Sequence, residues 1–442
     1  MEQEARISPT DSTRTSEASL GGLKKSFSWL LIGNLFFAAT QYLVLLGLIK
    51  KTSPETVGVF SLALAVSAPV TLFLAFGLRA VVLSDAKNAH VFSTYFTLRG
   101  LTAALSLFVI VCICLIAQYD FLIFRIVVLV SLIKVIESFQ DLGYGYLQKS
   151  HHNRQIATSM IMRGTLSCTL STAALFLTQS LTVAVACLLA ASLITAIFYD
   201  LPKLKSIASQ TKSGFWVLSQ PELKSMKLLL LLAAPLGLAA LLSSLEVNLP
   251  RYFIEHFINL RALGVYSALS YPLMLGNQII GTLALAPSAH LAELAIQRRF
   301  DAFRDLLFRL CLIGIGVGAV SSLICVFFGT DILTVLNNAD YAKESKAFGI
   351  MAIAAGISYV TVFFGSGLSS VQAFRLKFVL QVLTFLALAG FSLFASEYHS
   401  LLTMSFAILA SAVFSLVIQA GSFFIVVRRL QRSVQGIVIG TT

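Results

Sequence analysis

Long runs of apolar residues alternate with short polar connections along nearly the whole chain of 442 residues. Each run is long enough for a helix to cross a hydrocarbon core of about 30 Å, at about 1.5 Å per residue. The pattern predicts an all-α integral membrane protein with about twelve transmembrane helices. The predicted spans cover residues 27–49, 56–80, 95–117, 122–147, 155–178, 180–200, 228–253, 263–289, 303–328, 346–368, 376–396 and 400–427.

The longest polar connection divides the predicted spans into two sets of six. We therefore expect an N-terminal six-helix lobe at 26–200, a cytoplasmic linker at 201–227 and a C-terminal six-helix lobe at 228–430. The Ser-, Thr- and Glu-rich residues 1–25 and the last residues, 431–442, are predicted to be tails, the first of them disordered.

A short internal repeat suggests that the two halves are duplicates. Residues 57–61 read Val-Gly-Val-Phe-Ser, and residues 263–267 read Leu-Gly-Val-Tyr-Ser at the same position in the second half. Equal placement predicts parallel repeats related by an axis along the membrane normal, with a substrate cavity between the lobes.

Composition and charge exclude several classes of protein. Only 12% of the residues are charged, against roughly 25% in soluble chains, and the mean hydropathy is +0.87. The net charge of +12 would suggest nucleic acid in a soluble protein. Here most Lys and Arg residues fall on one side of the predicted membrane, which places both termini in the cytoplasm and leaves no reason to expect a nucleic-acid partner.

The sequence lacks the common catalytic motifs. It has no Gly-Lys dipeptide and hence no phosphate-binding loop for ATP, no His-Glu-x-x-His pattern and no Gly-x-Ser-x-Gly turn. We therefore expect no catalytic residue, no metal site and no cofactor, and a transporter in preference to an enzyme.

Three charged residues lie inside the fourth predicted span. Lys134, Glu137 and Asp141 are spaced by three and four residues and share one helix face. Lys134 lies about 18 Å and Glu137 about 22 Å from the outer start of the span, where contact with lipid would cost about 2.5–3.5 kcal/mol each. This face is predicted to line a polar cavity; the alternative is a self-satisfied pair that only fixes helix packing.

Further polar residues lie in other spans. Glu246 and Arg251 lie near the outer end of the seventh, where Pro250 should bend the helix. Arg251 is suited either to bind phosphate or to extend to the outer interface. Arg163, in the fifth span, is either a ligand for the substrate or an interfacial anchor.

The first span of each half carries features of a transport pathway. Asn34 and Gln41 lie one heptad apart, on one face, where they could contact sugar hydroxyls or neighbouring helices. Interrupted helices at matching places would indicate a moving pathway. Prolines fall in the first two spans of the halves, at Pro69, Pro235, Pro250, Pro272 and Pro287.

Three segments carry a resemblance to a known family: residues 248–254 (Asn-Leu-Pro-Arg-Tyr-Phe-Ile), residues 263–267, and residues 77–85 followed by Leu98-Arg99. With the twelve-span layout, residues 27–429 resemble the polysaccharide transport family. These are O-antigen-type flippases for lipid-linked oligosaccharides, within the multidrug/oligosaccharidyl-lipid/polysaccharide exporter superfamily. The positions that match are Asn248, Pro250, Arg251, Tyr252, Arg79, Asp85 and Arg99.

The resemblance implies two lobes around a cationic central cavity that move a polyprenyl-pyrophosphate-linked oligosaccharide from the inner to the outer leaflet of a bacterial inner membrane, by alternating access. Candidate partners are this lipid, the bilayer, a polysaccharide polymerase and glycosyltransferases. We expect substrate contacts at Lys134, Arg251, Asn248, Arg163, Asn34 and Gln41. Proton or ion coupling is expected at Glu137, Asp141 and Glu246. Structural or gating roles are expected at Pro69, Pro250, Tyr252, Arg79, Asp85 and Arg99.

Two other functions also fit the sequence. A cation-coupled multidrug exporter of the same superfamily commonly carries an acid in the first helix, and residues 27–49 contain none. A membrane polymerase or ligase acting on the lipid-linked glycan would need room for its acids, and the predicted outer loops are short.

Overall fold

The computed structural model describes residues 9–85, 92–210, 223–285, 287–336 and 339–439, and within these ranges the regular structure is helical throughout. The helices are α1 (Pro9–Lys51), α2 (Pro54–Leu74), α3 (Leu78–Ser84), α4 (Phe92–Ile116), α5 (Phe121–Lys149), α6 (Asn153–Thr178), α7 (Leu181–Thr195), the π-helix η1 (Ala196–Asp200), α8 (Leu201–Gln210), α9 (Leu223–Phe257), α10 (Leu260–Leu285), α11 (Ser288–Ile296), α12 (Phe300–Leu336), α13 (Ala339–Ala342), α14 (Ser345–Ser370), α15 (Phe374–Ser396) and α16 (Leu401–Ile439).

Ten segments of the described chain are helices long and apolar enough to cross a membrane. The two other predicted spans correspond to α5 and α10, which have 29 and 26 residues and so are also long enough. They are more polar because α5 carries the charged residues noted above and α10 carries Asn277 and Gln278. The prediction of an all-α, multi-pass membrane protein is confirmed.

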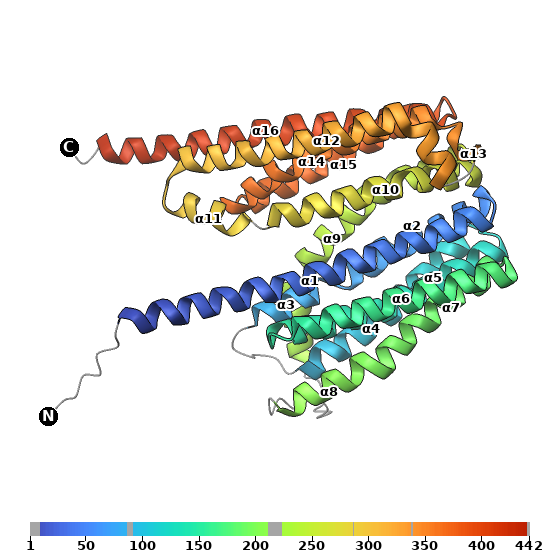
Figure 1. Ribbon diagram of the computed structural model, residues 1–442, viewed down its shortest axis with the longest axis horizontal. Coiled ribbons are helices and arrows are strands. Elements are labelled where there is room, and N and C mark those ends of the chain that lie inside the picture. The colour runs from blue at the N-terminus through green and yellow to red at the C-terminus, as the bar shows by residue number, and fades with distance from the viewer. Residues whose placement is uncertain (1–8, 86–91, 211–222, 286, 337–338, 440–442) are drawn as a thin grey trace.

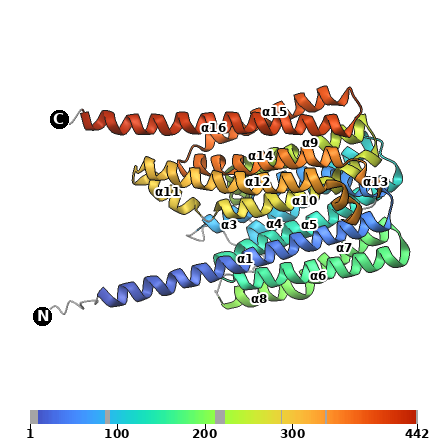
Figure 2. The same cartoon turned by 45° about the horizontal axis from the view of Figure 1, so that its top comes forward.

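The helices form two bundles that lie side by side, α1–α8 in one and α9–α16 in the other (Figure 1). We call these bundles the N lobe and the C lobe. Both chain termini lie at one end of the molecule, where α1 and α16 project beyond the other helices (Figure 2). We call this the termini end, and we call the opposite end, where α1 turns into α2 and α9 into α10, the loop end.

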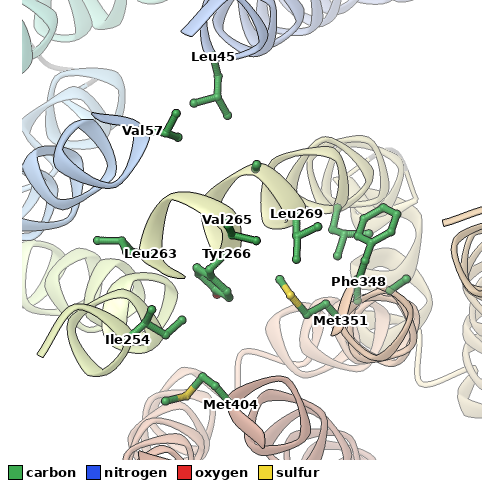
Figure 3. Close-up of a cluster of buried hydrophobic side chains, with 14 of the residues drawn as sticks. Leu45, Val57, Ile254, Leu263, Val265, Tyr266, Leu269, Phe348, Met351 and Met404 are labelled. Atoms are coloured by element: carbon green, nitrogen blue, oxygen red, sulfur yellow. The ribbon is translucent and has the colours of Figure 1, made fainter. Parts of the chain in front are cut away.

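The lobes meet where α2 packs against α9 and α10 and α1 packs against α10. At the loop end this junction is apolar, with Leu45 and Val57 of the N lobe close to Leu263 and Leu269 of α10 (Figure 3). Helices of the C lobe add Met351 and other side chains to the same core. Burial of these side chains favours contact between the lobes, because the side chains pack densely and gain van der Waals contacts.

The internal repeat lies at the centre of this junction. A Cβ atom added to Gly58 would overlap the carbonyl oxygen of Leu260, and one added to Gly264 would overlap the carbonyl oxygen of Pro54. The two glycines are thus reciprocal, and the absence of a side chain on each lets α2 and α10 approach closely.

The helix boundaries differ from the predicted ones in three places. The N-terminal segment is helical from Pro9, so much of the predicted tail at 1–25 belongs to α1. The predicted linker is helical at both ends, as α8 up to Gln210 and as α9 from Leu223, and residues 211–222 lie outside the described residues. At the C-terminus, α16 runs to Ile439, through most of the predicted tail at 431–442.

Four of the five prolines expected to interrupt helices do not interrupt them. Pro69, Pro235, Pro250 and Pro272 lie inside continuous helices. A proline bends a membrane helix without ending it where neighbouring helices satisfy the freed backbone groups. The break after α2 instead falls at Phe76 and Gly77, whose φ values are 50° and 56°. The last, Pro287, lies between α10 and α11.

Candidate functional site

A cluster of charged side chains occupies the interior of the N lobe, between α5 and α6. The Lys134 Nζ atom donates to Glu137 Oε2 at 2.8 Å, one turn along α5. Arg163 of α6 lies 3.8 Å from the other carboxylate oxygen of Glu137. The Arg163 side chain is only 7% exposed, so it is not an interfacial anchor. One carboxylate therefore holds two cations inside the membrane-spanning bundle, where an unpaired charge would be costly.

Two residues missed by the sequence analysis extend this cluster. Arg163 donates to Gln140 Oε1 at 2.7 Å, and the Gln140 amide donates to Asp200 Oδ2 at 2.7 Å. Asp200 is buried at the end of the π-helix η1. Such wide turns are rare and often occur at functional sites. Two signals were available: Gln140 follows Glu137 by three residues, and Asp200 ends an otherwise apolar run.

A small cavity of about 30 Å³ lies beside the cluster and is lined by residues of α1, α2, α5, α6 and α7. Gln41 reaches it, together with Lys134, Glu137 and Arg163. The Arg163 guanidinium also lies 4.1 Å from the centre of the Phe37 ring, a favourable cation–π contact. In this conformation Lys134, Glu137 and Arg163 pair with one another, and little space remains beside them.

The third charged residue of α5 belongs to a different group. Asp141 pairs with Arg79 at 2.8 Å, and Arg79 also donates to Gln148 Oε1 at 2.9 Å. Nearby, the Tyr95 hydroxyl donates to Asp85 at 3.2 Å, and Lys149 donates to the backbone oxygen of Asp85. These contacts join α3, α4 and α5 at the termini end. Asp141 is thus not part of the cluster with Lys134 and Glu137, although the three share a helix face.

Residues 248–254, near the end of α9, lie at the lobe junction. Arg251 is 5% exposed and donates to Asn248 Oδ1 at 2.7 Å, so it does not extend to the outer interface. Its neighbour Tyr252 donates its hydroxyl to the backbone oxygen of Ala65 in α2. This bond joins the two lobes directly.

Two other predicted residues stand apart from these groups. Asn34 is exposed and donates to the backbone oxygen of Leu30 in its own helix. Arg99 is 1% exposed, and its Nε and Nη2 atoms have no hydrogen-bond partner among the described residues. The structure therefore brings Lys134, Glu137, Arg163 and Gln41 together, and it does not bring Asn34, Arg99 or Arg251 to them.

A row of ion pairs crosses the loop end. Arg261, at the start of α10, lies 3.4 Å from Glu55 of α2 and 3.6 Å from Asp340 of α13. Asp340 also accepts from Lys343 at 2.8 Å, and this hydrogen bond and charge lower the pKa of the Asp340 carboxyl. Glu55 and Arg261 occupy equivalent positions of the two repeats, as Gly58 and Gly264 do.

The C lobe contains a cavity of about 930 Å³ between α9, α15 and α16. Glu246 lines it from α9, and Gln381 of α15 lines it as well and donates to Ser243 of α9 at 2.7 Å. Glu246 has no ion-pair partner within 4.0 Å in the described part of the chain. Among the same residues, no three His, Cys, Asp or Glu side chains are grouped to hold a metal ion.

Comparisons with known proteins agree on one family and one fold. The family described as "Polysaccharide biosynthesis protein" matches residues 23–287. The capsular polysaccharide biosynthesis protein CapF of Staphylococcus aureus is 24% identical over 383 residues, which are 84% of this chain and 93% of CapF.

Solved transporters of the MOP superfamily share the fold. An inward-facing multidrug resistance MATE transporter superimposes with a TM-score of 0.63 at 13% identity, over 92% of this chain and 96% of that chain. A MOP superfamily transporter from Pyrococcus furiosus, described as having a binding pocket of reverse polarity, superimposes with a TM-score of 0.61 at 14% identity, over 92% of this chain and 96% of that chain. At these identities the likeness concerns the fold alone.

Proposed function

Because this chain belongs to the polysaccharide biosynthesis protein family and has the fold of MOP-superfamily transporters, we propose that it is a flippase for a polyprenyl-pyrophosphate-linked oligosaccharide. The cargo would move from the inner to the outer leaflet of the bacterial plasma membrane. Pyrophosphate is anionic and sugars are polar, so neither crosses hydrocarbon unaided. The capsular relative supports a surface polymer as the end product.

The observation that carries the proposal is the pair of cations held deep inside the N lobe of a two-lobed membrane bundle. Lys134 and Arg163 share one carboxylate, Glu137. In our proposal the pyrophosphate competes with Glu137 for these cations, since phosphate binds both Lys and Arg well. Release of the cargo is aided when Glu137 recaptures them, because a site that held phosphate too tightly would not turn over.

The conformation supports alternating access. The lobes are joined at the loop end by the reciprocal glycines and by the Glu55–Arg261 pair. If the termini lie in the cytoplasm, as the positive-inside rule predicts, this is a state closed toward the outside. In this proposal the following residues act in gating rather than in binding: Pro69, Pro250, Tyr252, Arg79, Asp85, Arg99, Asn248, Arg251 and Asp141.

The experiment is a gene deletion complemented with wild-type protein, Lys134→Ala or Lys346→Ala. We would measure surface polysaccharide and the lipid-linked oligosaccharide trapped in each leaflet. Lys346 is an exposed cation of α14 outside these groups, so its variant should restore export. Lys134→Ala should restore less than a tenth of wild-type export at equal protein level, because in our proposal the pyrophosphate loses one of the two cations that bind it.

The outcomes separate the other functions. Export restored in full by Lys134→Ala would contradict the role of this cluster. Unpolymerised glycan in the outer leaflet of the deletion strain would indicate a polymerase or ligase, and normal surface glycan with raised drug sensitivity would indicate a multidrug exporter.

A further inference from the structure

The C-lobe cavity is the counterpart of the small N-lobe cavity. By order within each half, α9, α15 and α16 correspond to α1, α6 and α7. The first three line the C-lobe cavity, and the last three line the N-lobe cavity together with α2 and α5. The N-lobe space of about 30 Å³ is filled around Arg163, whereas the C-lobe space of about 930 Å³ stays open. The latter volume lies within the range of small-molecule sites, roughly 300–1,000 Å³.

Two cations lie at the start of α15, where the cavity meets the termini end. Arg375 and Lys377 both line the cavity and are exposed. Neither has a carboxylate within 4.0 Å among the described residues, and the Lys377 ammonium donates only to Ser369 Oγ, at 2.9 Å. The cations inside the N lobe, in contrast, share the Glu137 carboxylate. Two uncompensated cations beside an open cavity favour an anionic ligand.

The rest of the cavity wall is largely apolar. Leu236 and Leu238 of α9 face the space together with Phe374, Phe378 and Val379 of α15, and all five are exposed in the isolated chain. A ligand that packs against this apolar wall and also pairs with the two cations must therefore be amphipathic, with an apolar chain next to an anionic group.

The position of the acid restricts where the anion can bind. Glu246 lies 11 residues beyond Pro235 on α9, which is about 16 Å along the helix. Gln381, which bonds to Ser243 on the same stretch of α9, lies one turn beyond Lys377 on α15. The carboxylate therefore lies toward the loop end of the cavity, repels an anion there and leaves the Arg375 and Lys377 end as the favourable place.

We propose that the C-lobe cavity binds the phosphate group of a lipid, with Arg375 and Lys377 holding the phosphate and the lipid chain lying on the wall formed by α9 and α15. Two sources share this chemistry, the polyprenyl-pyrophosphate carrier and a bulk anionic phospholipid. The inference rests on the proposed function for the first source only. It makes the cavity a second phosphate site, separate from the N-lobe cluster.

The test measures binding to the full-length purified protein in phosphatidylcholine nanodiscs. The probes are farnesyl pyrophosphate, farnesol and nanodiscs doped with phosphatidylglycerol. Arg375→Gln/Lys377→Gln should weaken binding of the pyrophosphate about tenfold or more and leave farnesol unchanged, because charge-assisted contacts are lost. Arg309→Gln removes an exposed cation of the same lobe outside the cavity, and it should leave the affinities for farnesyl pyrophosphate and farnesol unchanged. Ala239→Phe places a large side chain in the cavity, and it should lower the affinity for both farnesyl pyrophosphate and farnesol.

A higher affinity for farnesyl pyrophosphate than for phosphatidylglycerol would support the proposed site and identify the polyprenyl-pyrophosphate carrier as its ligand. The reverse order of affinities would also support the site, with a phospholipid as its ligand. Equal binding by wild type and the double variant would overturn the inference. This failure is distinguishable from failure of the proposed function, which would appear as normal surface glycan in the deletion strain and needs no binding measurement.

Discussion

The two lobes have the same order of helices but differ in how their interior charges are paired. In the N lobe, Lys134 and Arg163 lie 2.8 and 3.8 Å from one carboxylate, that of Glu137, and little space remains beside them. In the C lobe, Glu246 and Lys377 lie on the wall of an open cavity without an ion-pair partner among the described residues. The same order of helices therefore encloses two different interiors, one in which Glu137 pairs with two cations and one with an open cavity.

The largest difference between the lobes is expected when one acid is removed from each. Glu137→Ala should lower the free energy of unfolding by about 3 kcal/mol, because it leaves two cations facing each other inside the bundle. Glu246→Ala removes a carboxylate that has no cation as its partner in the described part of the chain, and it should change the free energy of unfolding by less than about 1 kcal/mol. Thermal unfolding of the purified variants measures both. Equal losses in the two variants would show that the lobes do not differ in this respect.

The lobes are most alike at the reciprocal glycines, and replacing these tests that likeness. Gly58→Ala and Gly264→Ala should each oppose closure of the loop end by about 2 kcal/mol, since the added methyl overlaps a carbonyl oxygen of the other helix. Export should fall by about an order of magnitude in both. Gly316→Ala is the matched control, because a Cβ there meets nothing within 4 Å. Normal export in either junction variant would contradict the reciprocal role.

A subtler substitution examines how Arg163 is held. Arg163→Lys keeps the charge but loses the bond to Gln140 and the contact with the Phe37 ring. We expect a loss of about 1–2 kcal/mol in unfolding free energy. Arg309→Lys, at an exposed position, provides the comparison. A loss no larger than that of the control would mean that charge alone, and not the guanidinium, matters at this position.

The smallest effect is expected at the loop end, where Asp340 is exposed. Its pKa is lowered in the folded protein by Lys343, so its contribution to stability is present above the unfolded pKa of about 3.9 and is lost as the pH falls through the folded value. The difference in melting temperature between wild type and Asp340→Asn should thus be small and constant from pH 5 to 8. It should shrink only in stronger acid, and a change centred near pH 6 or 7 would exclude this assignment.

Much of the architecture could be predicted because the bilayer imposes a local rule. A span needs about 20 apolar residues wherever it lies in the fold, so the helices of the membrane bundle could be counted from hydropathy. Lys134 and Glu137 stood out for the same reason, since charge in a span is costly. Gln140 and Asp200 were missed because an amide and a single acid at a helix end are unremarkable until α6 and η1 bring Arg163 between them.

The membrane class, the approximate spans, the repeat containing Gly58 and Gly264 and the charge in α5 could be read from the sequence, since each depends on composition or on spacing along the chain. Which charges meet became visible only in the packed helices. Asp141 shares a face with Lys134 yet pairs with Arg79, and the cations of α15 face an open space while Arg163 does not. The physical reason is that ion pairing and cavity volume depend on distances between helices, which periodicity along one helix does not encode.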